Sequence, residues 1–155
     1  MTDTDTRTDI DDILAVHNGW LAANVDLIAE SMIGFFPGGD AYHQFNLNGF
    51  TYHGVQDKAK LWRNLTAIGA NITAISDTGA PTVEVFGDVA LLTSEGECEL
   101  MLPSASGKLE NSGPIRFRNT EFYRRDDGTG APQWRIWHMH VSEAAKAGTA
   151  KYVTE

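Results

Sequence analysis

Cysteine is almost absent from this chain, since Cys98 is its one cysteine in 155 residues. A single thiol cannot form an intrachain disulfide or supply the several thiolates of a cysteine-rich zinc site. Long apolar runs are missing too, because no stretch approaches the roughly 20 residues that a helix needs to cross a bilayer. The N-terminus, MTDTDTRTD, is polar and acidic, unlike a secretory signal peptide. We therefore expect a cytoplasmic protein that does not associate with a membrane.

Basic residues are few: 12 Lys and Arg face 21 Asp and Glu, which gives a formal net charge of −9. A negatively charged surface repels the phosphate backbone of nucleic acids, and no basic stripe interrupts it here. We therefore expect no nucleic-acid binding. Hydrophobic residues make up 42% of the chain and aromatic residues 10%, which is typical of one soluble globular domain. A neutral or weakly anionic small molecule is the partner that fits this composition.

Hydrophobic periodicity predicts helices in the first half of the chain. Apolar residues at helical spacing indicate a helix over residues 9–23, a short one over 26–32 and a third over 56–68. Between the second and third helices, residues 41–54 read as a β-hairpin with Asn48-Gly49 as its turn.

The second half of the chain reads as strands separated by turns rich in Gly, Asp and Ser. The predicted strands span residues 72–76, 82–86, 89–102, 114–125 and 133–142. Helices followed by antiparallel strands predict an α+β domain, in which the helices pack on one face of a curved sheet and enclose a pocket. We expect this domain over residues 9–142, after a disordered N-terminus (1–8) and before a polar C-terminal tail (143–155).

Three stretches of the sequence, FNLNGFTYHG, RNTEFYRRDDG and WRIWHMHVS, resemble the SnoaL-like branch of the NTF2-like (ketosteroid-isomerase-like) superfamily. The resemblance covers about residues 9–142. It implies a cone of three N-terminal helices on a curved, mostly antiparallel sheet, without a metal or organic cofactor. It also implies homodimers or homotrimers formed through the outer sheet face. FNLNGFTYHG in addition looks like cofactor-independent lyases that release formaldehyde from lignin-derived diarylpropanes.

Two histidines near the C-terminus are candidate catalytic residues. His138 and His140 are two residues apart in a predicted strand and therefore share one of its faces. On the concave face, their ordinary pKa of about 6.5 would suit proton transfer, and Trp137, Met139 and Val141 would then face a neighbouring subunit. A structural pair of hydrogen-bonded rings is the main alternative. A metal site is disfavoured because it needs a third and a fourth ligand. Glu97, Glu99 or Glu121 could contribute one, but nothing in the spacing demands it.

Arg118 is a third candidate, because the arginine before the threonine points inward in the family pattern. There it would stabilise a developing negative charge, with Thr120 on the same strand face. A salt bridge to Asp40 or Glu121 is the structural alternative. A β-bulge would reverse the strand's facing and turn Glu121 into the pocket instead.

The hairpin supplies further candidates: His53 as a catalytic group, and Asn46 and Tyr42 as substrate contacts. The resemblance carries part of this hypothesis, because in the similar lyases this stretch lies beside the cavity. Asp40 stands where family members often place an acidic residue, and in an apolar pocket its pKa would rise.

Aromatic residues on both helices and strands predict an apolar, ring-shaped binding site, although such residues more often form core. The substrate-binding candidates among them are Trp20, Trp62 and Phe122. The expected function is therefore a cofactor-independent lyase or isomerase for a hydroxylated aromatic molecule. A non-catalytic binding or oligomerisation domain is the alternative, because this fold hosts both enzymes and non-enzymes.

Overall fold

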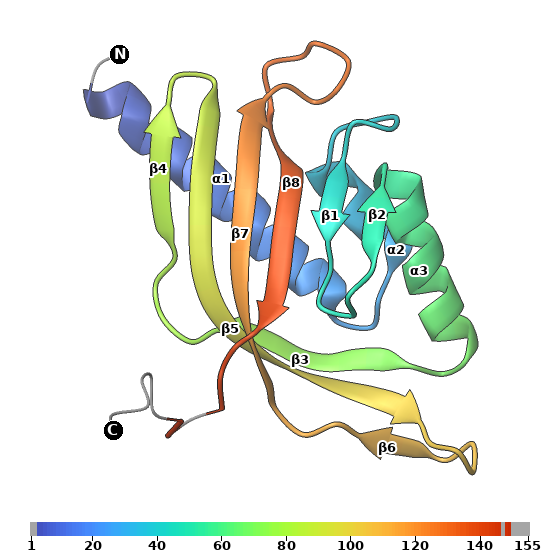
Figure 1. The fold of residues 1–155 in the computed structure, drawn as a ribbon. Coiled ribbons are helices and arrows are strands. Elements are labelled where there is room, and N and C mark those ends of the chain that lie inside the picture. Colours follow the sequence, from blue (N-terminus) through green and yellow to red (C-terminus); the bar gives the residue numbers. More distant parts are fainter. Residues whose placement is uncertain (1–2, 147, 150–155) are drawn as a thin grey trace.

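The computed structural model describes residues 3–146 and 148–149, and its three helices and eight strands are drawn in Figure 1. The helices are α1 (Asp3–Asn24), α2 (Ala29–Met32) and α3 (Val55–Ala67), with a 3-10 turn, η1 (Ile33–Phe35), after α2. The strands are β1 (His43–Phe45), β2 (Thr51–His53), β3 (Asn71–Asp77), β4 (Thr82–Phe86), β5 (Val89–Pro103), β6 (Leu109–Asn111), β7 (Ile115–Arg125) and β8 (Trp134–Glu143).

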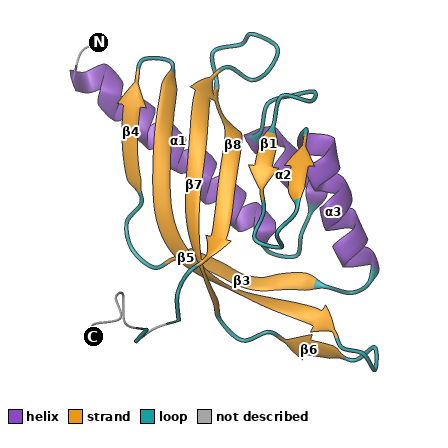
Figure 2. Cartoon of the chain, in the orientation of Figure 1, coloured by secondary structure: helices purple, strands orange, loops and turns teal. Residues whose placement is uncertain are grey.

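All eight strands form one sheet of order β2-β1-β8-β7-β5-β3, with β4 and β6 also paired to β5. Every pairing is antiparallel except that of β1 with β8. Helix α1 crosses one face of this sheet, and α3 lies beside the β1–β2 hairpin (Figure 2). The predicted α+β cone is therefore confirmed.

Helix α1 begins at Asp3, earlier than predicted, so the segment expected to be disordered is helical from Asp3 onward. Aspartates near its first turn favour the positive end of the helix dipole, which accounts for the longer helix. Its buried stripe of Asp9, Ile13, His17 and Trp20 faces the sheet. The expected C-terminal tail falls partly outside the described residues.

A buried ion pair anchors α1 to the sheet. Asp9 Oδ2 accepts a hydrogen bond from Arg125 Nη2 at 2.6 Å, and Oδ1 accepts one from Trp134 Nε1 at 3.1 Å. The Asp9 side chain is only 4% exposed. These contacts fix the helix against β7 and β8.

The sheet is strongly curved because β5 pairs with β4 through its first half and with β3 through its second. Gly96 lies at this change of partner, where an added Cβ would clash with the Phe117 ring and lie 2.8 Å from the Ser76 carbonyl oxygen. Only glycine allows this close approach. Strand β6 was predicted as part of a turn, because its three exposed residues lack apolar alternation.

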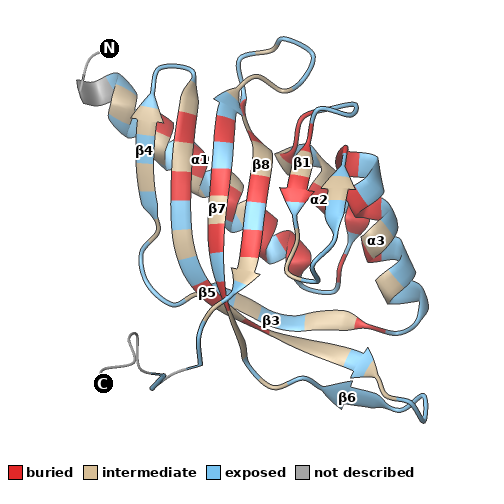
Figure 3. Ribbon diagram, in the orientation of Figure 1, coloured by how far each residue is buried: buried red, intermediate tan, exposed pale blue. Residues whose placement is uncertain are grey.

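Burial alternates along β7, as the colours of Figure 3 show. Phe117, Asn119, Glu121 and Tyr123 are buried against the helices, so the even-numbered residues point to the opposite side, here called the outer face. In β8 a register shift opposite Phe122 and Tyr123 inserts one residue. Because of this bulge, the side chains that follow it in β8 point to the opposite face from the one that strict alternation predicts.

The bulge buries Met139 and Val141 and turns His138 and His140 outward. The prediction that the histidines face the concave side and that Met139 and Val141 face a neighbour is therefore wrong. None of the helices in the described part of the chain combines the length and apolar character that a membrane span requires.

Candidate functional site

The concave side of the sheet contains a buried polar cluster centred on His17. Its Nδ1 lies 2.9 Å from Oε1 of Glu121, and its Nε2 lies 2.9 Å from Oδ2 of Asp77. The side chains of His17 and Glu121 are fully buried, and that of Asp77 is 13% exposed. Helix α1, strand β3 and strand β7 thus each supply one member, and each ring nitrogen meets its own carboxylate.

Two neighbours on β7 also donate hydrogen bonds to the Glu121 carboxylate. Asn119 Nδ2 donates a hydrogen bond of 2.7 Å to Oε1, and the Tyr123 hydroxyl donates a short one to Oε2. Because residues two apart in a strand share a face, the odd-numbered residues of β7 reach the same buried space. His17, Asp77, Asn119, Glu121 and Tyr123 are called the His17 cluster below.

The charge state of His17 follows from opposing effects on its pKa. Burial lowers the pKa, but hydrogen bonds and charges from Glu121 and then Asp77 outweigh burial and raise the pKa to about 8. At neutral pH His17 is therefore an imidazolium between two carboxylates. A proton donor and proton acceptors thus lie in direct contact in a water-poor interior.

Two phenols, Tyr123 within the cluster and Tyr42 near the Glu121 charge, remain protonated. Burial, followed by the charge of Glu121, raises the pKa of both Tyr42 and Tyr123 well above the usual value. The Tyr42 hydroxyl donates to Gln44 Oε1 at 2.6 Å. Protonated phenols in this setting act as hydrogen-bond donors rather than bases.

Four buried polar atoms around the cluster have no hydrogen-bond partner among the described residues. They are Trp20 Nε1, Asp77 Oδ1, Ser94 Oγ and Asn119 Oδ1. Buried polar groups are nearly always paired, so a group of such atoms on neighbouring elements is unusual. Ser94 and Asn119 face each other across β5 and β7. These atoms leave the cluster able to make further hydrogen bonds to a bound molecule.

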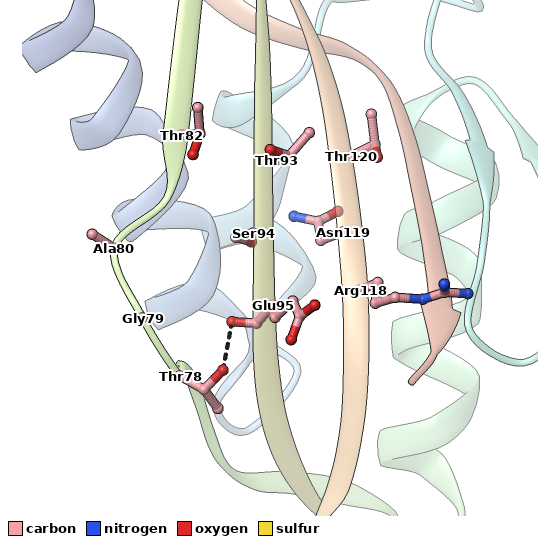
Figure 4. A pocket seen from close by; sticks show the side chains of 10 residues that line it. All are labelled: Thr78, Gly79, Ala80, Thr82, Thr93, Ser94, Glu95, Arg118, Asn119 and Thr120. Atoms are coloured by element: carbon pink, nitrogen blue, oxygen red, sulfur yellow. Dashed lines mark hydrogen bonds between the residues drawn. The ribbon is translucent and has the colours of Figure 1, made fainter. Parts of the chain in front are cut away.

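An open cavity of about 510 Å³ adjoins two of these four residues, Ser94 and Asn119, where the connection between β3 and β4 leaves the sheet edge (Figure 4). Ser94 and Asn119 line it together with residues of that connection, such as Thr78. The predicted residues Arg118 and Thr120 also line this cavity. Its volume is in the range that small-molecule sites occupy. Asn119 belongs to both the cavity lining and the His17 cluster, and so connects the two.

The structure brings the predicted residues Arg118, Thr120, Phe122, His138 and His140 together, but on the outer face. Arg118 Nη2 donates to Ser142 Oγ at 3.2 Å, and Figure 4 shows its side chain directed toward β8. The expectation that they face the interior is wrong, because the odd-numbered residues of β7 occupy its inner positions. A catalytic role for them stays a prediction.

His53 also lies on the outer face, next to the ring of His43. Its ring centre is 5.0 Å from that of His43, whose Nδ1 lies 3.0 Å from Nδ1 of His138. The Phe45 ring packs edge-on, in T-shaped contacts, against the rings of His138 and His140. We call His43, Phe45, Phe122, His138 and His140 the outer-face cluster.

The remaining predicted residues divide between core and surface. Glu121, Trp20, Trp62 and Tyr42 are buried in the interior, so Glu121 rather than Arg118 is the inward residue of β7. Asp40 is exposed, and the guanidinium of Arg118 contacts Ser142 rather than Asp40. Asn46 is half-buried and lines a second open cavity of about 310 Å³ beside the hairpin.

Four members of the His17 cluster were missed from sequence: His17, Asp77, Asn119 and Tyr123. His17 gave a usable signal, because a histidine within an apolar helical stripe needs buried partners. Asp77 gave no such signal, because it ends a strand and its sequence context predicts a turn residue. Among the described residues, no group of three or more His, Cys, Asp or Glu side chains is placed to hold a metal ion.

Comparison with known proteins gives the fold but not the sequence family. No family model and no curated protein matches the sequence. Three similar solved structures illustrate the range of proteins that share this fold. An NTF2-like superfamily protein from Salmonella enterica is 18% identical, with a TM-score of 0.72 over 95% of this chain and 99% of that one.

The other two structures have different descriptions. A ketosteroid isomerase-like protein from Erwinia carotovora is 16% identical, with a TM-score of 0.64 over 87% of this chain and 95% of that one. The CaMKII hub of S. rosetta is 18% identical, with a TM-score of 0.61 over 86% and 95%. Identities this low establish the fold alone: the chain has the NTF2-like fold, as its sequence resemblance implied.

Proposed function

We propose that this protein is a cofactor-independent acid–base enzyme, a lyase or isomerase, that acts on a hydroxylated aromatic small molecule. The observation that carries the proposal is the contact of His17 with Glu121 and Asp77 in the interior. An imidazolium and carboxylates in contact provide a proton donor and acceptors without a cofactor. The ketosteroid isomerase-like neighbour lends support at the level of the fold.

The cluster assigns distinct roles to its members. His17, with its pKa of about 8, donates a proton near neutral pH, and Glu121 or Asp77 accepts one. The Tyr123 hydroxyl and the Asn119 amide hold the Glu121 carboxylate in place.

Within this class, we propose the elimination of formaldehyde from a lignin-derived diarylpropane diol. The diol gives a stilbene, formaldehyde and water, so neither an oxidant nor a reductant is needed. One hydroxyl departs as water after receiving a proton, and the other loses its proton as the carbon–carbon bond breaks and formaldehyde leaves. The reaction therefore needs one acid and one base.

The test incubates the purified protein with a diarylpropane diol and measures stilbene absorbance and released formaldehyde. The expected result is equal amounts of both products, and a loss of both in His17→Gln. Lys60→Gln, which changes an exposed residue of α3, is the matched control. A folded wild-type protein that forms neither product contradicts the lyase assignment. Proton exchange into aromatic ketones, followed in heavy water, then tests the isomerase class.

A second candidate is a non-catalytic binding or oligomerisation domain, which the outer-face cluster favours. Phe45 and Phe122 are 44% and 36% exposed there, beside four of the five histidines. One neighbour is described as a hub, and the fold is compatible with a homo-oligomer. We propose a homodimer or homotrimer formed through this face. A monomer by sedimentation at high protein concentration would rule it out.

A further inference from the structure

Lys58 is a buried amine that the proposed function does not use. It lies in the first turn of α3 and is only 5% exposed. Its Nζ donates a hydrogen bond of 2.9 Å to Oδ1 of Asn46 and lies 5.4 Å from the centre of the Tyr52 ring. The adjacent Asp57 instead accepts a hydrogen bond from the His53 backbone.

Within the described part of the chain, no carboxylate forms an ion pair with Lys58. A buried ammonium without a counter-ion is strongly disfavoured, whereas a neutral amine needs only ordinary hydrogen bonds. Burial accordingly lowers the pKa of Lys58 to about 7. A large share of Lys58 is thus a neutral, nucleophilic amine at neutral pH.

A chain of hydrogen bonds fixes the acceptor that faces this amine. The Tyr42 hydroxyl donates to Gln44 Oε1, and Gln44 Nε2 donates to Asn46 Oδ1 at 2.7 Å. Asn46 Oδ1 therefore accepts from both Gln44 and Lys58, which leaves its amide oriented with the oxygen toward the amine. An amide oxygen orients the Lys58 amine without favouring its charged form, whereas a carboxylate would stabilise the ammonium.

Asn46, which accepts the hydrogen bond from Lys58, also lines the second cavity. Its volume is about 310 Å³. The lining combines apolar residues, such as Phe45 and Phe50, with polar ones, among them Asn46, His140 and Glu143. A small, uncharged, partly apolar molecule suits this lining. The cavity brings such a molecule to the residue that contacts the Lys58 amine.

We propose that Lys58 is a nucleophilic residue that condenses with a small aldehyde to form a Schiff base. The amine nitrogen bonds to the carbonyl carbon, and the resulting carbinolamine loses its oxygen as water. The two amine protons leave with that oxygen, so the condensation consumes and produces no electrons. This reactivity does not depend on the His17 cluster.

The test treats the full-length protein with acetaldehyde and sodium cyanoborohydride, which reduces the imine to a stable secondary amine. Peptide mass spectrometry then gives the initial labelling rate of each lysine across the pH range. We expect Lys58 labelling to reach half its maximum near pH 7. An ordinary exposed lysine has a pKa of about 10.4 and is labelled mainly at higher pH. Lys60, exposed on the same helix, is the reference residue.

A paired variant separates reactivity from mere burial. Asn46→Asp places a carboxylate beside the amine, which stabilises the ammonium, and should lower Lys58 labelling at pH 7 by about tenfold or more. Lys60 labelling and the melting temperature serve as controls for reagent and fold. The proposal is overturned if Lys58 stays unlabelled while Lys60 reacts, or if both lysines share one pH profile. Undiminished labelling in folded Asn46→Asp overturns it as well.

Discussion

Oε1 of Glu121 lies 2.9 Å from Nδ1 of His17, although the two residues are 104 positions apart in the sequence. Both side chains are fully buried, and Asp77 contacts the opposite ring nitrogen. A charged group in the interior is tolerated only when it is paired, so this arrangement couples the fold's stability to the protonation of His17.

The first prediction concerns that coupling. The folded-state pKa of His17, about 8, lies above its ordinary value of 6.5, so folding favours the protonated ring. The resulting stability is fully present below about pH 6.5 and is lost as pH rises through about 8. We expect the difference in free energy of unfolding between wild type and His17→Gln to shrink by about 2 kcal/mol across this window.

Urea denaturation at a series of pH values measures this difference. Lys58 titrates in the same range, but it does so in both proteins, and the subtraction removes its contribution. His53→Gln, a change at an exposed histidine, should leave the pH profile unaltered. A His17→Gln difference that stays constant with pH would be inconsistent with a raised pKa.

The second prediction concerns the base. Glu121→Gln keeps the shape of the side chain but removes its charge, so it should lower turnover of the diol by about 100-fold or more. The same change should lower the pKa of His17, because the charge of Glu121 helps to raise it. Product formation and an NMR titration of the ring measure the two effects. Glu110→Gln, on exposed β6, is the control, and equal activity of both variants would remove Glu121 from the mechanism.

The third prediction concerns the outer face. Phe122→Asp should weaken self-association by about 100-fold or more, because a buried charge replaces an aromatic contact. Sedimentation measured over a range of protein concentrations gives the dissociation constant. Ile68→Asp alters an exposed apolar residue just after α3 and should have no effect. Equal association of the two variants would place the interface elsewhere.

The fourth prediction concerns the anchor of α1. Asp9→Ala leaves Trp134 Nε1 without its acceptor and Arg125 without its buried counter-ion, and should destabilise the fold by about 3 kcal/mol. Asp88→Ala removes the other, exposed partner of Arg125 and should change stability by less than about 1 kcal/mol. Urea denaturation compares the two variants, and a similar effect from both would mean that Asp9 adds nothing through burial.

Local pattern in the sequence determined most elements of the fold. Asn48-Gly49 predicted the hairpin turn, and Gly49 does adopt a positive φ of 83° between β1 and β2. Strand β4 was predicted with the bounds that the structure has, and α3 to within one residue at each end. These features depend on neighbouring residues, whose spacing the sequence displays directly.

Only the tertiary structure decided which residues meet inside the cone. Period-two alternation says that Arg118 and Glu121 point to opposite faces, but not which face the helices cover. The bulge in β8 then reversed the facing of His138 and His140, since one inserted residue moves every later side chain to the other side. The contact of Glu121 with His17 depends on α1 crossing the inner face of β7. Such contacts between distant segments are set by packing, which local periodicity does not encode.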